Sequence, residues 1–90
     1  MSLPALLIQL MEARSIQGKD LAKRLGHRPS YVSQVRMGKR SIAPKAIPKW
    51  AHALRLTELE REEFIMEVML SHGPPELREY VIRLRANQRN

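Results

Sequence analysis

The sequence has no cysteine and no apolar run long enough to cross a bilayer. Without cysteine there is neither a disulfide framework nor a thiolate metal site, which fits a cytoplasmic setting. A membrane-spanning helix needs about 20 apolar residues in a row. The opening stretch MSLPALLIQLMEA lacks the basic start and the small-residue cleavage site of a signal peptide, so we interpret it as part of the fold. We expect no contact with membranes.

Residue sets for catalysis or metal binding are also missing. The three histidines, at positions 27, 52 and 72, do not have the spacing of a ligand set, and we assign them surface or packing roles. No Ser/His/Asp or Cys/His arrangement and no glycine-rich phosphate loop is present. The glutamates between positions 58 and 67 fit the start and the solvated face of a helix better than acid–base pairs. We predict no enzyme activity, no cofactor and no metal.

Acidic residues are scarce in one part of the chain. Residues 14–49 contain ten lysines and arginines against Asp20 alone, whereas residues 1–13 and 50–90 each carry a net charge of −1. The whole formal excess of +7 therefore lies in the middle segment. A cluster of one sign builds a field that attracts a polyanion, and nucleic acid is the obvious candidate.

The same segment has the pattern of two short helices joined by a sharp turn. Apolar residues four apart give the helix expected at 18–25 one apolar face, and residues three apart do so at 29–37. These residues are Leu21 and Leu25, then Val32 and Val35. Gly26 lies between the two, where a helix end needs a positive φ. A helix-turn-helix fits, with its second helix in the DNA major groove. From spacing alone, an all-α protein that binds no DNA remains an equal alternative.

The stretch HRPSYVSQVRMGKRS resembles the recognition helix and following loop of the lambda-repressor/Cro-like (XRE) helix-turn-helix family, which often reads S-P-S-Y-[IV]-S-Q-[IL]-E-x-G-K-R. The resemblance covers about residues 3–57. It implies an all-α fold, a compact bundle of five to six helices containing a lambda-repressor-like DNA-binding domain. We expect one domain over residues 1–90, with a DNA-binding core at 3–57 and C-terminal helices at 58–85 that complete the core and dimerise.

Burial of Val32 and Val35 turns the other side of the second helix outward, where the family reaches base edges. Gln34 is the strongest candidate, because its amide can pair bidentately with adenine. The residues expected to contact bases are Arg28, Pro29, Ser30, Ser33 and Gln34. The residues expected to contact phosphates are Gln17, Gly18, Lys19, Tyr31, Arg36, Lys39 and Arg40.

Two positions depart from the family pattern. Relatives mostly carry a phosphate-contacting glutamine where this chain has Gly18. Relatives also often pair an arginine late in the first helix with a glutamate late in the third, and here these places hold Met11 and Arg36. Losing both partners together avoids a buried unpaired charge, which costs about 3–5 kcal/mol. We expect Arg36 either to face phosphate or to pair with Glu12.

The C-terminal half predicts further helices. Pro44 and Pro48 leave two possible starts for a fourth helix, whose inner face includes Trp50 as a core residue. Thr57 and Glu60 have capping-box spacing, so a fifth helix should run from there to about Ser71, followed by a sixth. The apolar stripe of the fifth helix is too wide for one neighbour, which predicts a homodimer. The residues expected at its interface are Phe64, Val68, Met69, Leu77, Val81 and Leu84. A monomeric core of five or six helices is the alternative.

The resemblance implies a sequence-specific DNA-binding transcriptional regulator, most simply a repressor of bacterial, phage or plasmid type. It would bind a palindromic operator in double-stranded DNA as a homodimer, in the cytoplasm and with the nucleoid. The alternative is an antitoxin-type interaction protein, which binds a partner protein through its C-terminal helices and autoregulates its operon.

Overall fold

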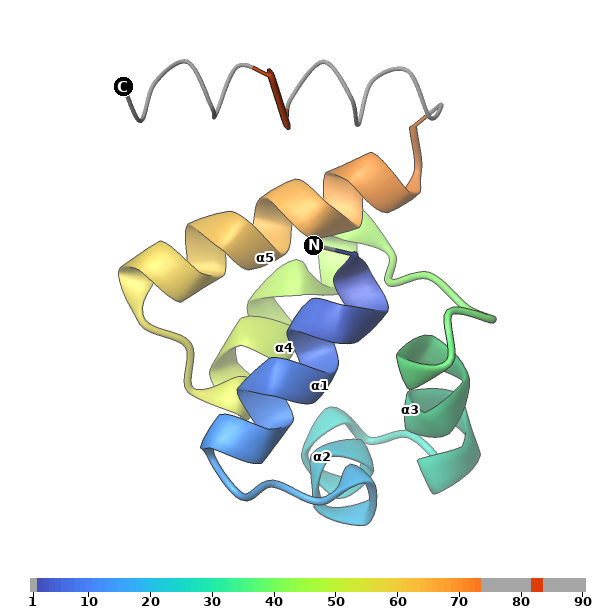
Figure 1. Cartoon of the computed structure of the whole chain (residues 1–90). Helices are drawn as coiled ribbons and strands as arrows, with labels where there is room; N and C mark the ends of the chain where they lie inside the picture. Colours follow the sequence, from blue (N-terminus) through green and yellow to red (C-terminus); the bar gives the residue numbers. More distant parts are fainter. Residues whose placement is uncertain (1, 74–81, 84–90) are drawn as a thin grey trace.

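The computed structural model describes residues 2–73, 82 and 83, and it is all-helical over that part of the chain (Figure 1). The chain order is α1 (Leu3–Ala13), α2 (Gly18–Leu25), α3 (Pro29–Arg36), a short 3₁₀ turn η1 (Pro44–Ala46), α4 (Ile47–Leu54) and α5 (Glu58–Ser71). The predicted all-α bundle with its helix-turn-helix is therefore confirmed. No helix of the described part is long and apolar enough to cross a membrane.

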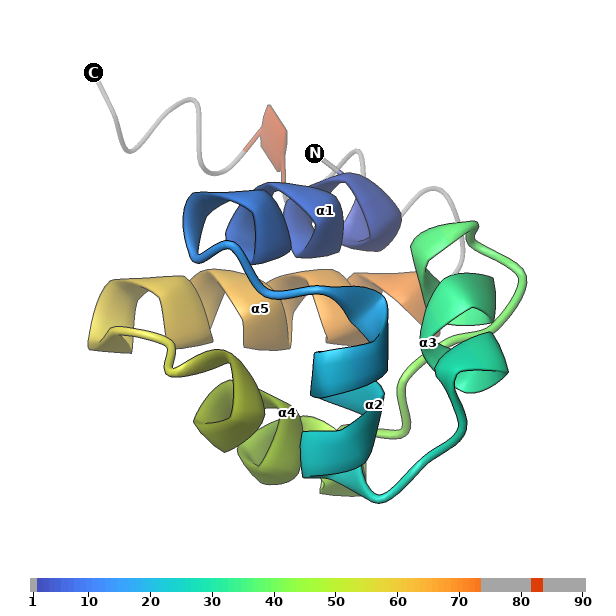
Figure 2. The same ribbon diagram turned by 90° about the horizontal axis from the view of Figure 1, so that it is seen from below.

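All five helices contribute to one core. Each supplies at least one side chain with 0–1% exposure: Leu7, Leu21, Val32, Trp50 and Phe64. Helix α1 packs against α3 and α5, and α2 packs against α3 and α4. In both views α3 lies at one edge of the molecule (Figures 1 and 2). Within the described part of the chain one long side of α3 is uncovered, and Pro29, Ser30, Ser33 and Gln34 are exposed on it.

The direction of the chain between α2 and α3 is set by a glycine and a proline, Gly26 and Pro29. Gly26 caps α2 with a φ of +73°, a left-handed conformation that a residue without Cβ adopts at no steric cost. Arg28 is extended (φ −79°, ψ 150°), as a residue before proline prefers. Pro29 then opens α3, where no intrahelical donor is needed. These residues fix the direction in which α3 leaves the corner.

The segment after α3 settles where the fourth helix starts. Gly38 has a left-handed conformation, with a φ of +76°. Pro44 begins the single 3₁₀ turn η1, and regular helix starts at Ile47 with Pro48 in its first turn. Both prolines thus mark a start, the first of a 3₁₀ turn and the second of an α-helix. Trp50 is 1% exposed, and its assignment to the core is confirmed.

The predicted capping box at the start of α5 is present. The Glu60 backbone N–H donates to Thr57 Oγ1 at 3.3 Å, and the Thr57 N–H donates to Glu60 Oε1 at 2.9 Å. Two backbone donors that the helix leaves unpaired are thereby satisfied. The cap fixes where α5 begins, and so which of its faces meets α1 and α4.

The structure corrects two of the residues assigned to a dimer interface. Phe64 and Val68 are both 0% exposed, because the core shared with α1 and α4 covers them. Their assignment to a contact between chains is wrong. Met69 is 50% exposed and remains available to a partner. Most of the predicted sixth helix lies outside the described residues, and so do Leu77, Val81 and Leu84.

Candidate nucleic-acid interface

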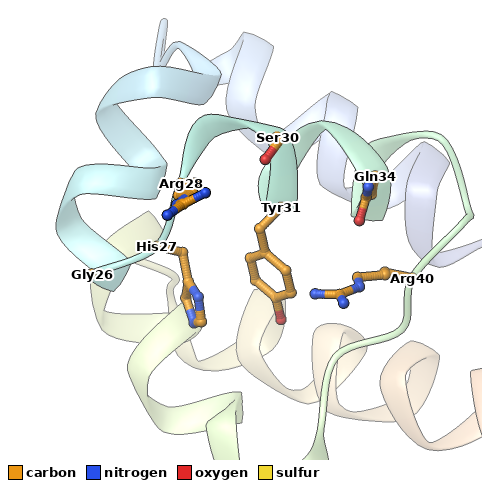
Figure 3. Close-up of a pocket in the computed structure, with 7 residues that line it drawn as sticks. All are labelled: Gly26, His27, Arg28, Ser30, Tyr31, Gln34 and Arg40. Atoms are coloured by element: carbon orange, nitrogen blue, oxygen red, sulfur yellow. The ribbon is translucent and has the colours of Figure 1, made fainter.

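The outward side of α3 carries the polar residues that we predicted from the sequence to lie there. Val32 and Val35 are fully buried, and this fixes the rotation of the helix about its axis. Four side chains on the opposite side are exposed: Pro29, Ser30, Ser33 and Gln34. Figure 3 shows Ser30 and Gln34 on α3 at the rim of a hollow of about 420 Å³. The face offers hydroxyl and amide groups, which can exchange hydrogen bonds with base edges.

Cations flank this face at both ends of the helix. Arg28 is exposed at the N-cap of α3, and Arg36 is exposed in its last turn. Lys39 and Arg40 follow in the exposed loop after Gly38. The central polar face with basic ends matches the division between base contacts and phosphate contacts seen in DNA-binding helices.

Tyr31 connects the surface of α3 to the core. Its ring is half-buried, with its centroid 6.2 Å from that of Trp50. The His27 ring stacks on it with centroids 4.2 Å apart and an angle of 29° between the planes. The Arg40 guanidinium carbon is 5.6 Å from the Tyr31 centroid, within cation–π range. Tyr31 therefore holds two surface groups at fixed places beside α3 (Figure 3).

The first turn of α2 brings the two departures from the family pattern together. Arg36 Nη1 lies 3.4 Å from the position that a Cβ on Gly18 would occupy, and Val32 lies 3.9 Å from it. Gln17 is the exposed N-cap of α2 and makes no side-chain cap bond, and Lys19 is exposed beside it. The guanidinium of Arg36 thus occupies space that a longer side chain at position 18 would need.

Arg36 does not pair with Glu12. Both residues line one shallow hollow, yet within the described part of the chain the ion pair is formed only between Arg14 and Glu60. Of the two possibilities left open for Arg36, the contact with Glu12 is therefore not formed. The guanidinium stays exposed beside the first turn of α2.

Two other cations of the basic segment have structural partners. Arg14 pairs with Glu60 of α5, and Arg24 Nη1 donates to the Ala53 carbonyl at 2.9 Å. The backbone N–H of Thr57 lowers the pKa of Glu60 from its ordinary value of 4.5, with Arg14 lowering it further against the opposing effect of burial. These contacts join α1 to α5 and α2 to α4, so the two arginines stabilise the fold.

Sequence reasoning missed three residues of this surface. His27 was correctly given a surface or packing role, but its stack on Tyr31 was not predicted, because the stack depends on the path of the chain between α2 and α3. Lys49 of α4 reaches the same corner, with its Nζ 3.8 Å from the position of a Cβ on Gly26. Met37 is 62% exposed beside Ser33, whose Oγ donates to its sulfur at 3.9 Å. No local pattern indicated that Lys49 would lie near Gly26, because that proximity depends on how α2 packs against α4.

The fold and this surface define a helix-turn-helix DNA-binding protein. Residues 7–60, more than half of the chain, match a family model described as helix-turn-helix. The chain belongs to the lambda-repressor/Cro-like (XRE) helix-turn-helix family of DNA-binding transcriptional regulators. Neither the curated proteins nor the solved structures contain a match to it. Members of this family are typically regulators of transcription and not enzymes.

Proposed function

We propose that the protein is a sequence-specific repressor that binds a palindromic operator as a homodimer, with α3 in the major groove. The observation that carries the proposal is the uncovered face of α3, whose exposed polar centre has exposed arginines at both ends. A face of this kind reads bases through its centre and grips the backbone through its ends. Occupation of a promoter would then exclude the polymerase.

Gln34 is the proposed specificity residue, since an exposed amide in the middle of α3 can pair with N6 and N7 of adenine. Ser30, Ser33, Pro29 and Arg28 complete the proposed base contacts, and Arg28, at the N-terminal end of the face, can reach either a guanine or a phosphate. The proposed phosphate contacts come from α2, α3 and the loop that follows: Gln17, Gly18, Lys19, Tyr31, Arg36, Lys39 and Arg40. All of these side chains are exposed or half-buried, and Gly18 is half-buried.

Dimerisation is proposed through the outer side of α5. Leu59 is 78% exposed and Met69 is 50% exposed, with the half-buried Met66 between them on the same side of the helix. Large apolar side chains grouped on one exposed face are typical of an interface. A two-fold dimer would set two copies of α3 one DNA turn apart, so we expect half-sites about 10 bp apart. Leu77, Val81 and Leu84 remain predicted members of this interface.

Selection from genomic DNA fragments, followed by footprinting of the bound fragment, tests the proposal. We expect one protected palindrome and a steep fall of affinity with salt, with a slope of about −0.9 per phosphate neutralised. Equal binding to all fragments would contradict sequence-specific repression. It would leave a DNA-binding protein without a defined operator.

The exposed apolar residues of α5 also favour a second candidate, an antitoxin-type protein that binds a partner protein and autoregulates its operon. Light scattering on the protein purified from its own cells separates the two candidates. A mass of two identical chains supports the homodimer, whereas stoichiometric co-purification of one other protein supports the second candidate. In either case we expect the protein in the cytoplasm, with the nucleoid.

A further inference from the structure

His27 has no role in the contacts proposed so far, yet it lies within the DNA-facing hollow. The hollow is lined by residues of the α2–α3 corner, of α3 and of the loop after it: Gly26, His27, Arg28, Ser30, Tyr31, Gln34 and Arg40. Three of these residues are proposed base contacts: Ser30 and Gln34 on the base-reading face of α3, and Arg28 at its end. The imidazole is therefore next to that face and at the same surface (Figure 3).

The His27 ring has a defined position, although the residue is exposed. It stacks on Tyr31 with centroids 4.2 Å apart, and Tyr31 is itself anchored beside the buried Trp50. The backbone N–H of His27 donates to the Ala22 carbonyl at 2.9 Å, which ties the residue to the last turn of α2. A side chain that is held before DNA arrives loses little rotamer freedom when it makes a contact.

Each element next to the His27 ring contributes basic residues. Arg28 at the start of α3 and Arg40 of the following loop line the hollow, and Lys49 of α4 reaches Gly26. Helix α2 ends with Lys23 and Arg24, while its acidic residue Asp20 lies in the first turn at the opposite end. None of the hollow's lining residues is acidic. A hollow with this rim suits a DNA phosphate.

We propose that the His27 imidazole is a DNA phosphate contact, positioned by Tyr31, and that it holds the phosphate more strongly when it is protonated. The inference rests on the proposed function, because it requires α3 to face DNA. Imidazole is the side chain that ordinarily changes charge between about pH 5 and pH 8. Imidazolium can donate from both nitrogens and adds a positive charge facing the backbone. Binding DNA then takes up a proton at the ring.

The sign of the pH effect follows from this proton uptake. If the complex binds more protons than the free partners, the association constant rises as the pH falls. The limit for one proton is about tenfold per pH unit, and we expect the affinity to rise by about threefold or more from pH 8 to pH 6. The salt slope of binding at the lower pH should be steeper by up to about 0.9.

The test measures the affinity of the full chain for a random-sequence duplex of about 30 bp by fluorescence anisotropy, since phosphate contacts do not depend on sequence. Affinities are compared at pH 6 and pH 8 at one ionic strength. We expect tighter binding at pH 6 for the unaltered protein. His27→Phe keeps an aromatic ring on Tyr31 but cannot titrate, so its affinity should be the same at both values. His27→Arg should bind tightly at both.

His52→Gln is the matched control, because His52 is exposed on α4 and lines a different hollow, with Arg24, Ala53 and Arg55. It should keep the pH dependence of the unaltered protein. His27→Gln provides a second test if the phenylalanine variant does not fold, as judged by circular dichroism. Equal pH dependence in the unaltered protein and in the His27 variants would overturn the inference. Failure of the unaltered protein to bind any duplex would instead overturn the proposed function, and the inference with it.

Discussion

Gly18 and Arg36 both depart from the family pattern. They are 18 positions apart in the sequence but lie side by side in the structure. The guanidinium of Arg36 lies 3.4 Å from where a Cβ on Gly18 would be, at the first turn of α2. The family uses a glutamine at position 18 to contact a phosphate, and here an arginine from α3 reaches the same place. We infer that Arg36 supplies the side-chain phosphate contact that a glycine lacks, while the Gly18 backbone N–H stays available to a phosphate.

This exchange predicts the behaviour of a double variant. Arg36→Ala should weaken binding to all DNA sequences and reduce the magnitude of the salt slope by about 0.9, because one cation leaves the backbone. Adding Gly18→Gln should recover part of the affinity without recovering the slope, since an amide is neutral. Titration of both variants against one duplex across a range of salt checks this. An unchanged affinity and slope in Arg36→Ala would rule out the phosphate contact.

The exposure of a side chain was predicted correctly where it depends on the spacing of residues within one helix. The spacing of Val32 and Val35 was enough to place Ser30 and Gln34 outside, because a helix that buries one side must expose the other. Prediction failed where two elements meet. Lys49 at Gly26 depends on packing between helices, and the stack of His27 on Tyr31 depends on the path of the corner.

At the scale of the element, helix ends were predicted best where a local signal specifies them. Gly26 ended α2 and the Thr57–Glu60 box started α5 as expected. Pro44 and Pro48 left the start of the fourth helix open, since proline is tolerated in the first turn of both an α-helix and a 3₁₀ turn. In the structure the 3₁₀ turn starts at Pro44 and the α-helix at Ile47, and Ile47 and Trp50 are buried in the core.

The capping box predicts how stability depends on the side chains at the start of α5. Thr57→Ala should reduce the free energy of unfolding by about 0.5–2 kcal/mol, because one helix N–H loses its acceptor. The thermal or urea unfolding curve measures this loss. DNA affinity under conditions where the variant is fully folded should be unchanged, as the cap lies away from α3. A loss of DNA affinity in the folded variant would contradict this separation.

Glu60 adds a pH dependence of known sign. Its pKa is lowered in the folded protein by the Thr57 N–H and by Arg14, so its ionised form stabilises the fold above the ordinary value of 4.5. That stabilisation should be lost as the pH falls below this value, through the lowered pKa. Glu60→Gln keeps an acceptor for the cap but does not titrate. Its unfolding free energy should decline less between about pH 5 and pH 3 than that of the unaltered protein.

At the scale of the whole molecule, the apolar stripe of α5 was predicted correctly, but Phe64 and Val68 lie on its core-facing part and not on the part left for a partner. Phe64 and Val68 are covered by the protein's own core, so a single chain satisfies most of the stripe. The sequence alone could not show this, because how much of a helix one neighbour covers depends on their crossing. Met69 of the stripe stays exposed, and so does Leu59, nearer the start of α5.

Two variants of α5 should therefore behave differently. Phe64→Ala should destabilise the fold by about 3–5 kcal/mol, as expected for a large side chain removed from a closed core. Met69→Glu should leave the unfolding curve of the single chain nearly unchanged and shift the mass in solution from dimer to monomer. Light scattering and circular dichroism measure the two effects. A dimer that persists in both Met69→Glu and Leu59→Glu would exclude this face as the interface.

The central claim is that the uncovered face of α3 reads DNA through Gln34. The most direct test compares Gln34→Ala with Lys39→Ala on the footprinted operator and on random DNA. We predict that Gln34→Ala costs about 1–3 kcal/mol on the operator alone and relaxes the preference at one base pair, whereas Lys39→Ala weakens both equally. An equal loss on both DNAs for Gln34→Ala would contradict direct reading by this residue.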